Sequence, residues 1–321
     1  GLGDRQVECA GHRAEIGVHR AGAVGGIFNL WGREAVAQKQ KLAVERSRLG
    51  IPLFFGLDVV HGHRTVFPIP LAEACAFDPD LWRRTSRAAA REASGDGIDL
   101  TFAPMLDIAR DPRWGRIAEG PGEDPLVGAM FADAKIRGFQ GESLAATTSI
   151  AATAKHYCGG GAARAGLEYA AADMSERTLR EVYLPPFRAA VRAGCAAIMP
   201  AFNSVFDLPM TANAPLLRRL LRDDLGFDGV LISDYCAIEE LIAQGVAADR
   251  GEAAELAIGA GIDMDMVSGV YVACLPDALA AGRVNAATLD AAVRRVLTLK
   301  EKLGLFDDPY RRMKAAPYVL S

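Results

Sequence analysis

The feature that most constrains this chain is the alternation of short apolar segments with longer segments of helical periodicity. Seven apolar segments are readable, at 22–30, 51–60, 98–108, 149–157, 195–203, 230–232 and 261–267. Between and after them, apolar residues recur at helical spacing over 33–50, 79–95, 123–139, 175–193, 213–225, 237–260, 271–282 and 286–303. Strands that alternate with helices in this way predict a parallel sheet covered by helices on both faces.

We therefore predict an α/β protein with a TIM-type (β/α) barrel, because such a barrel uses about 250 residues or more as a single domain. Seven strands are one short of a closed barrel, so the first strand is expected to be missing or incomplete, with its place before residue 22. Residues 1–310 are predicted to form this catalytic barrel domain. The polar tail 311–321 contains a proline and is predicted to start a linker to a second domain that this chain lacks.

The composition excludes several classes of partner and cofactor. The 321 residues are 50% hydrophobic and carry a formal net charge of −4, and no run of Lys and Arg is interleaved with aromatic residues, so nucleic acid is not an expected partner. No apolar run is long enough to span a membrane. The six cysteines are scattered without metal-ligand spacing, so we expect free thiols and neither a zinc site nor a disulfide framework.

Polar side chains gather where the predicted strands end. In a barrel of parallel strands, functional groups stand at the carboxyl ends of the strands. A single residue of this kind could be a buried polar group whose hydrogen bonds are all made within the protein. Polar residues at the ends of six strands together predict a common site. They are Asp58, His61, Asp107, Arg116, Lys155, His156, Asn203, Asp234, Tyr235, Asp263 and Asp265.

Asp234 directly follows the buried strand at 230–232 and precedes a helical segment. Its position fits a functional carboxylate at a strand end, and it equally fits an Asp that caps the following helix. No phosphate loop or dinucleotide fingerprint is present, since the three glycines at 159–161 lack the required spacing. Carboxylates and cations around an aromatic residue suit a sugar, and an ionised Asp beside Lys and His suits attack on an anomeric carbon.

The chain resembles glycoside hydrolase family three, in particular its bacterial β-glucosidases. The resemblance covers most of 22–310 and rests on the stretches 56–62 (GLDVVHG), 101–125 (TFAPMLDIARDPRWGRIAEGPGEDP), 154–157 (AKHY), 173–187 (DMSERTLREVYLPPF) and 232–235 (ISDY). It implies a barrel, usually followed by an α/β sandwich domain, that hydrolyses terminal β-D-glucosyl residues with retention and without a metal or organic cofactor. A periplasmic or secreted location is implied in the same way.

The resemblance also implies roles for individual residues. Asp234 would be the nucleophile. The hydroxyls of the sugar in the first subsite would be held by Asp58, Arg116, Lys155 and His156, and the subsite would be lined by Tyr235, Met199 and Phe202.

The chain departs from the family pattern in three ways, of which the first two concern the acid/base, a Glu in two-domain members. In two-domain members this Glu lies in the second domain, so it is expected to come from a sandwich domain or a neighbouring subunit outside this chain. Single-domain N-acetylglucosaminidases use a His in the loop after the Lys-His strand, and loop 158–174 has none. In the same loop Gly160, Arg164 and Leu167 replace an aromatic, a Glu and a basic residue of β-glucosidases, which leaves substrate preference open.

Other functions remain open at this point. The barrel could bind sugar without turnover, it could have β-xylosidase or N-acetylglucosaminidase-type specificity, or Lys155 could be a Schiff-base lysine of a lyase. Glu168 is a candidate acid/base within the chain. Asp124 is expected to start a helix, Trp114 to pack, and Asp107 and Asp263 to bond neighbouring barrel groups.

Overall fold

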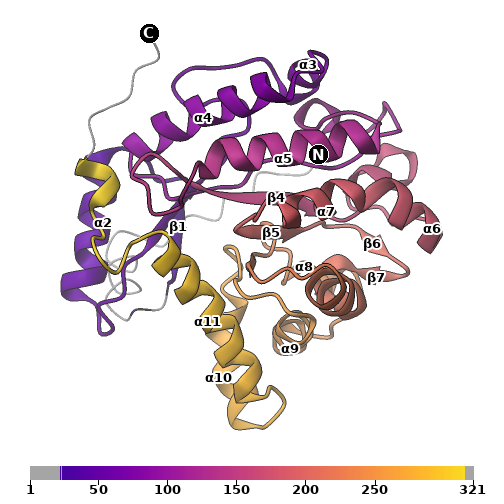
Figure 1. Cartoon of the computed structure of the whole chain (residues 1–321). Helices are drawn as coiled ribbons and strands as arrows, with labels where there is room; N and C mark the ends of the chain where they lie inside the picture. The colour runs from indigo at the N-terminus through magenta and orange to yellow at the C-terminus, as the bar shows by residue number, and fades with distance from the viewer. Residues whose placement is uncertain (1–21, 23, 315–321) are drawn as a thin grey trace, which may run out of the picture.

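The computed structural model describes residue 22 and residues 24–314. A curled sheet of six parallel strands forms the centre of the molecule (Figure 1). Its strands lie in the order β1 (Gly26–Phe28), β2 (Phe54–Leu57), β3 (Leu100–Thr101), β4 (Ala151–Tyr157), β5 (Ala197–Pro200) and β8 (Val230–Leu231). Each of these strands was predicted, and their sequential order is that of repeated strand-helix-strand units.

The seventh predicted strand is present only as a short extension of the sheet. Met264 forms a single parallel bridge with Ile232, next to β8. Among the described residues the sheet is open between this segment and β1, and a cavity of about 600 Å³ lies there, lined among others by Phe28 and Met266. The described residues therefore form a half-barrel, and the strand predicted before residue 22 lies outside them.

Helices cover the convex face of the sheet, and α4, α5 and α7 lie along one side of it (Figure 1). The helices are α2 (Arg33–Arg46), α3 (Pro70–Ala74), α4 (Pro79–Gly95), α5 (Pro125–Gln140), α6 (Glu176–Thr178), α7 (Pro185–Arg192), α8 (Glu240–Ala243), α9 (Arg250–Ala260), α10 (Val270–Ala280) and α11 (Ala286–Lys302). Two segments are wound more widely as π-helix, at Leu179–Tyr183 and Pro215–Asp224, and a small hairpin consists of β6 (Ser204–Val205) and β7 (Leu208–Pro209). Asp124 caps α5, as expected, by accepting bonds from the amides of Leu126 and Val127.

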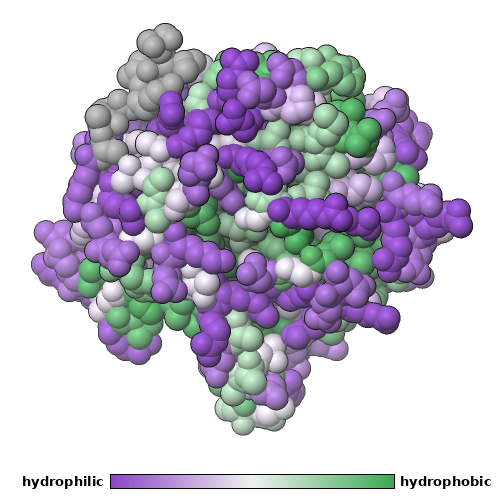
Figure 2. Space-filling model, in the orientation of Figure 1, coloured by the Kyte–Doolittle hydropathy of each residue, from purple (hydrophilic) through white to green (hydrophobic). Residues whose placement is uncertain are grey.

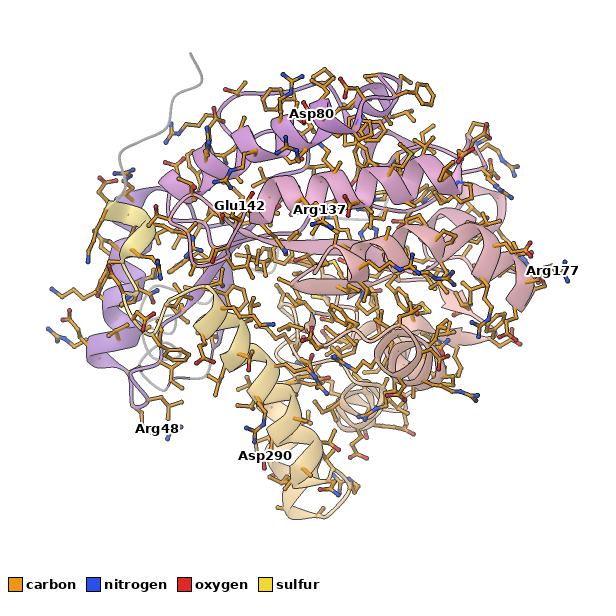
Figure 3. All side chains as sticks on the ribbon, in the orientation of Figure 1. Arg48, Asp80, Arg137, Glu142, Arg177 and Asp290 are labelled. Carbon is orange, nitrogen blue, oxygen red and sulfur yellow. The ribbon has the colours of Figure 1, made fainter. Side chains whose placement is uncertain are left out.

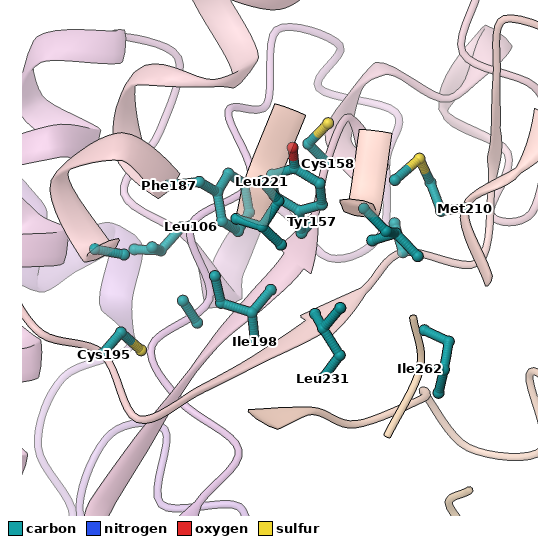
Figure 4. Close-up of a cluster of buried hydrophobic side chains, with 14 of the residues drawn as sticks. Leu106, Tyr157, Cys158, Phe187, Cys195, Ile198, Met210, Leu221, Leu231 and Ile262 are labelled. Atoms are coloured by element: carbon teal, nitrogen blue, oxygen red, sulfur yellow. The ribbon is translucent and has the colours of Figure 1, made fainter. Parts of the chain in front are cut away.

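Alternate residues of each strand enter two separate apolar cores. In β8, Leu231 packs in the layer between sheet and helices, whereas its neighbour Val230 belongs to a smaller cluster inside the curl. Figure 4 shows part of the outer layer, in which side chains from β4, β5 and β8 meet Phe187 of α7 and Leu221. Because side chains alternate along a strand, the apolar pattern fixes which residues point into the curl and so which residues reach its open end.

A buried charge cluster closes the other end of the curl. Asp99, just before β3, accepts bonds from the Phe55 amide and from Arg312, which is 2% exposed. The ammonium of Lys300 donates to the Pro52 carbonyl, and burial lowers its pKa to about 8. The turn at Arg311–Lys314 is thereby fixed to the base of the sheet, while the domain boundary at residue 310 remains a prediction.

Hydrophilic residues cover most of the face in Figure 2. The charged residues labelled in Figure 3 are all exposed: Arg48, Asp80, Arg137, Glu142, Arg177 and Asp290. Within 24–314, every helix is too short or too polar to cross a membrane.

Replacement of Arg312 by Met tests the charge cluster. The free energy of unfolding should fall by about 3–5 kcal/mol, because removal of one partner leaves the buried Asp99 carboxylate without its guanidinium. Urea denaturation measures the change. The control Arg137→Met removes an exposed helical ion pair with Asp133 and should change stability by less than about 0.5 kcal/mol. Equal effects of the two substitutions would contradict the role assigned to Arg312.

Candidate active site

Asp234 stands at the open end of the curl. Val230 and Ile232 belong to the inner core, so the period of two along the strand turns Asp234 to the same face. The residue is 9% exposed. Its Oδ1 accepts a bond of 2.7 Å from the Tyr235 amide, and its buried Oδ2 accepts none from the part of the chain that the structure describes. Helix α8 begins only at Glu240, so the carboxylate does not cap that helix, and one oxygen is left for another partner.

Lys155 and His156 come from adjacent positions of β4, yet both lie at the site. An irregularity of the pairing with β5 between Lys155 and Tyr157 interrupts the alternation of side chains. Lys155 reaches Asp58, with 2.8 Å between Nζ and Oδ1. His156 reaches Asp234, with 3.5 Å between Nε2 and Oδ2. This irregularity thus brings the Lys155 ammonium and the His156 imidazole to the same end of the sheet as the carboxylates of Asp58 and Asp234.

Asp107 fixes the orientation of His156. Its Oδ2 accepts from the His156 amide at 2.9 Å and from ring Nδ1 at 2.8 Å, and its Oδ1 accepts from the Gly161 amide at 3.3 Å. Since a carboxylate accepts at Nδ1, that nitrogen carries a proton and Nε2 is directed toward Asp234. The prediction that Asp107 bonds neighbouring barrel groups is confirmed. The Asp263 carboxylate likewise bonds neighbouring protein groups, because it accepts hydrogen bonds from Arg222, Arg295 and the Leu231 amide.

Arg116 lies in a second group of charges. It forms two parallel bonds to Glu119, of 2.8 and 3.0 Å, and its NH1 is 3.6 Å from Glu168 Oε1. Burial alone would lower the pKa of Arg116, but the carboxylates of Glu119, Asp107 and Glu168 outweigh it and raise that pKa. Burial by itself raises the pKa of Glu119, and the positive charges of Arg116, Lys155 and His156 reverse this to a net lowering. Arg116 and Glu119 are therefore both ionised, and their bidentate geometry holds the guanidinium in place.

The loop 158–174 is packed tightly against the segment that contains Asp107 and Trp114. A side chain at Gly160 would place its Cβ 2.6 Å from Asp107 Oδ1, and at Gly166 2.6 Å from the Trp114 amide nitrogen. Trp114 is 2% exposed and its indole nitrogen donates to Glu168, so its predicted packing role is confirmed. The glycines serve the close approach of two backbones, which explains a glycine run that matches no phosphate-binding pattern.

The aromatic residues of the predicted subsite differ in exposure. Tyr235 is 48% exposed and meets Phe28 edge-on, with 6.2 Å between the ring centroids. Phe202 is half-buried against Tyr169, with ring centroids 4.7 Å apart. Met199 is 3% exposed and lies beside Lys155 in the register of β4 and β5.

Some residues of the predicted constellation lie apart from these contacts. His61 pairs with the Phe67 carbonyl in its own loop, and Asp265 bonds Ser268 and the Tyr271 amide. Asn203 donates to the Gly159 carbonyl.

Three residues at the site were not singled out from the sequence: Glu119, Tyr169 and Glu240. Glu119 could have been found from its spacing of three residues from Arg116, which suits an ion pair on one turn. Nothing in the sequence places Tyr169 or Glu240, because their positions depend on how the loop 158–174 and α8 pack.

The arrangement offers two cationic side chains, one imidazole and several carboxylates near the buried Oδ2 atom of Asp234. Such groups hydrogen-bond hydroxyls in both directions. Among residues 24–314, no group of three His, Cys, Asp or Glu is placed to hold a metal ion.

Comparison with known proteins gives a consistent picture. Residues 6–299 match the N-terminal domain of glycosyl hydrolase family 3. The chain is 44% identical over 292 residues to the periplasmic beta-glucosidase of Salmonella typhimurium, covering 91% of this chain and 38% of that protein. It is 39% identical over 296 residues to a beta-xylosidase of Formosa agariphila, covering 85% of this chain and 41% of that protein.

Solved structures of beta-glucosidases are similar to this chain as well. The beta-glucosidase of Listeria innocua in complex with isofagomine superimposes with a TM-score of 0.89 and 42% identity, over 92% of this chain and 42% of that one. A mutant of that enzyme in complex with laminaribiose gives a TM-score of 0.92 and 40% identity, over 98% and 44%. The chain therefore spans about two-fifths of the length of these relatives.

Replacement of Gly160 by Ala tests the packing around Asp107. The added methyl should push the carboxylate away and lower the free energy of unfolding by about 1–3 kcal/mol. The ring resonances of His156 in an NMR spectrum should shift as its bond to Asp107 loosens. Gly115→Ala is the control, since its Cβ would meet nothing within 4 Å. An unchanged His156 signal together with unchanged stability would show that Asp107 does not depend on this contact.

Proposed function

Because the chain belongs to glycosyl hydrolase family 3, we propose that it is the barrel domain of a retaining β-glucosidase that hydrolyses terminal, non-reducing β-D-glucosyl residues. The observation that carries the proposal is the Asp234 Oδ2 atom. It is buried at a strand end, accepts no hydrogen bond within the described residues and lies 3.5 Å from His156 Nε2. A carboxylate oxygen without a hydrogen bond is suited to nucleophilic attack.

In the proposed reaction, Asp234 attacks the anomeric carbon and forms a glycosyl ester while the bond to the leaving oxygen breaks. A general acid gives its proton to that oxygen. The same group, now a base, takes a proton from water, which attacks the anomeric carbon and releases glucose and the Asp234 carboxylate. Two displacements at one carbon retain the β configuration.

The other side chains of the site would bind hydroxyls of the glucosyl unit. Asp58 is suited to accept, because its side chain is 49% exposed while Lys155 fixes one oxygen. Lys155 and Arg116 would donate to hydroxyl oxygens, and His156 would accept from a hydroxyl at its ring Nε2. Tyr235, Met199 and Phe202 would line the same subsite, with Tyr235 at its exposed edge.

The acid/base is proposed to come from outside this chain, from a second α/β sandwich domain or a neighbouring subunit. Glu168 is the alternative within the chain, but it accepts from the Trp114 indole and lies 3.6 Å from Arg116. Both contacts engage its carboxylate with other side chains of the barrel, so it is not free to meet a leaving oxygen. Residues 1–310 would then be the barrel, completed by a strand before residue 22, and 311–321 the start of the linker.

One other specificity has support. A relative of similar identity is named a beta-xylosidase, so a β-xylosyl unit in the first subsite is the second candidate. A Schiff-base lyase is disfavoured, because the Lys155 ammonium is held by Asp58 at 2.8 Å.

The nucleophile is tested by incubation with a fluorinated β-glucoside carrying a dinitrophenyl leaving group, which departs without an acid. The intact mass should rise by one glycosyl unit, and peptide mapping should place it on 228–241. Asp234→Asn should abolish the adduct, whereas Asp228→Asn, whose side chain is 87% exposed in the same peptide, should retain it. Glucose binding without any adduct would indicate a barrel that binds sugar without turnover.

The role of Lys155 is tested by calorimetric binding of glucose. Lys155→Met should raise the dissociation constant roughly 10- to 100-fold, because a charge-assisted bond contributes about 1.5–3 kcal/mol. Lys302→Met removes an exposed ammonium, 3.9 Å from Asp228, and should leave binding unchanged. Equal affinities of the two variants would remove Lys155 from the subsite.

A further inference from the structure

A small second cavity has walls rich in arginine, and none of the residues assigned to the sugar subsite lines it. Its volume is about 30 Å³, and its polar walls include Arg218, Arg222, Arg295, Asp263 and Thr288. Arg218 and Arg222 lie four residues apart on the π-helical segment Pro215–Asp224, and Arg295 belongs to α11. Three guanidinium-bearing side chains from two elements therefore line one small space.

The carboxylate of Asp263 balances only one of these three positive charges. Its Oδ2 accepts from Arg222 at 2.8 Å and from the Leu231 amide at 2.9 Å, and its Oδ1 accepts from Arg295 at 2.8 Å. Within the described residues, Arg218 donates to backbone carbonyls, which carry no net charge. Three guanidinium groups less one carboxylate leave an excess of two positive charges around the cavity.

One hydrogen-bond donor at the cavity is left without an acceptor. The Nε atom of Arg222 is buried and has no partner among the described residues, although the terminal nitrogens of the same side chain donate to Asp263 and to backbone carbonyls. A Cβ atom on Gly261, which also lines the cavity, would lie 3.9 Å from the Nε atoms of both Arg218 and Arg222. Because a buried donor without an acceptor is unfavourable, this position indicates a bound acceptor.

The electrostatics of Arg222 favour an acceptor that carries negative charge. Burial lowers the pKa of Arg222, and the charges of Arg295 and Arg218 lower it further, so that the opposing carboxylate of Asp263 does not compensate. A water molecule could accept from Nε, but it would leave the excess positive charge unchanged. An anion would both accept the hydrogen bond and reduce the repulsion between the guanidinium groups.

We propose that this cavity binds one monatomic inorganic anion of the size of chloride, held between the guanidinium groups of Arg218, Arg222 and Arg295. A cavity needs about 10–15 Å³ to hold one water molecule, so a volume of about 30 Å³ admits a chloride ion but not the five heavy atoms of phosphate. The arginines hold Asp263, which bonds the Leu231 amide of β8, so the bound anion is expected to stabilise the fold.

Thermal unfolding of the 321-residue chain in sodium chloride and in sodium gluconate, at equal ionic strength, tests the site. Gluconate is too large for the cavity. Chloride should raise the midpoint of unfolding by about 2–4 °C, because an anion that binds only the folded state stabilises it by mass action. Arg218→Gln should abolish the difference between the two salts, whatever the substitution does to the stability in gluconate, since it removes one wall of the site.

The matched control is Arg219→Gln. Arg219 is the next residue of the same segment, is also exposed and does not line the cavity, so the loss of its equal charge should leave the chloride-dependent rise unchanged. Crystals soaked in sodium bromide should show an anomalous peak beside Arg222 Nε, and crystals of the Arg218→Gln variant should lack it.

Four outcomes would overturn the proposal. They are equal midpoints of the unaltered chain in the two salts, a chloride-dependent rise that persists in Arg218→Gln, a rise that Arg219→Gln abolishes equally, and bromide crystals without a peak between the three arginines. A bromide peak without any chloride-dependent rise would be an adventitious ion only. Sodium phosphate that raises the midpoint as much as chloride, and only while Arg218 is present, would assign the cavity to an oxyanion and refute a monatomic one.

Discussion

The rest of the site depends on the hydrogen bonds that the buried carboxylate of Asp107 accepts. It follows β3, bonds the backbone and ring of His156 at the end of β4, and accepts from Gly161 in the loop 158–174. Three parts of the chain are thus joined by one carboxylate of 2% exposure. Because its acceptors are used by backbone and ring donors, Asp107 acts on Asp234 only through the orientation that it gives His156.

The two ends of the curled sheet use charge in different ways. At the base, Asp99 and Arg312 are buried and bonded to each other, so their charges fix the last turn of the described chain. At the open end, some carboxylate oxygens are not fully engaged by protein groups. Half of the Asp58 side chain is exposed, and Asp234 Oδ2 accepts no hydrogen bond from the described residues. Charged groups that are bonded to each other are engaged within the fold. A carboxylate that is held in place but has an oxygen without a hydrogen bond is available to a ligand.

The proposal that the acid/base comes from outside this chain agrees with the contacts of Glu168. The chain spans about two-fifths of its relatives and belongs to the N-terminal domain of the family. In the described half-barrel the carboxylate of Glu168 is engaged by Trp114 and Arg116, whereas Asp234 Oδ2 accepts no hydrogen bond from the described residues.

By itself, the sequence determined the six strands, the helices between them and the strand ends at which Asp58, Lys155, His156 and Asp234 lie, because buried strands and amphipathic helices leave local apolar patterns. It also indicated that Asp107 and Asp263 bond protein groups. Only the tertiary structure decided that Lys155 and His156 both face the site, since this depends on an irregular pairing with β5. The same holds for Tyr169 and Glu240, whose places follow from the docking of a loop and a short helix. Contacts between segments far apart in the chain leave no periodic signal, so no local pattern could have placed them.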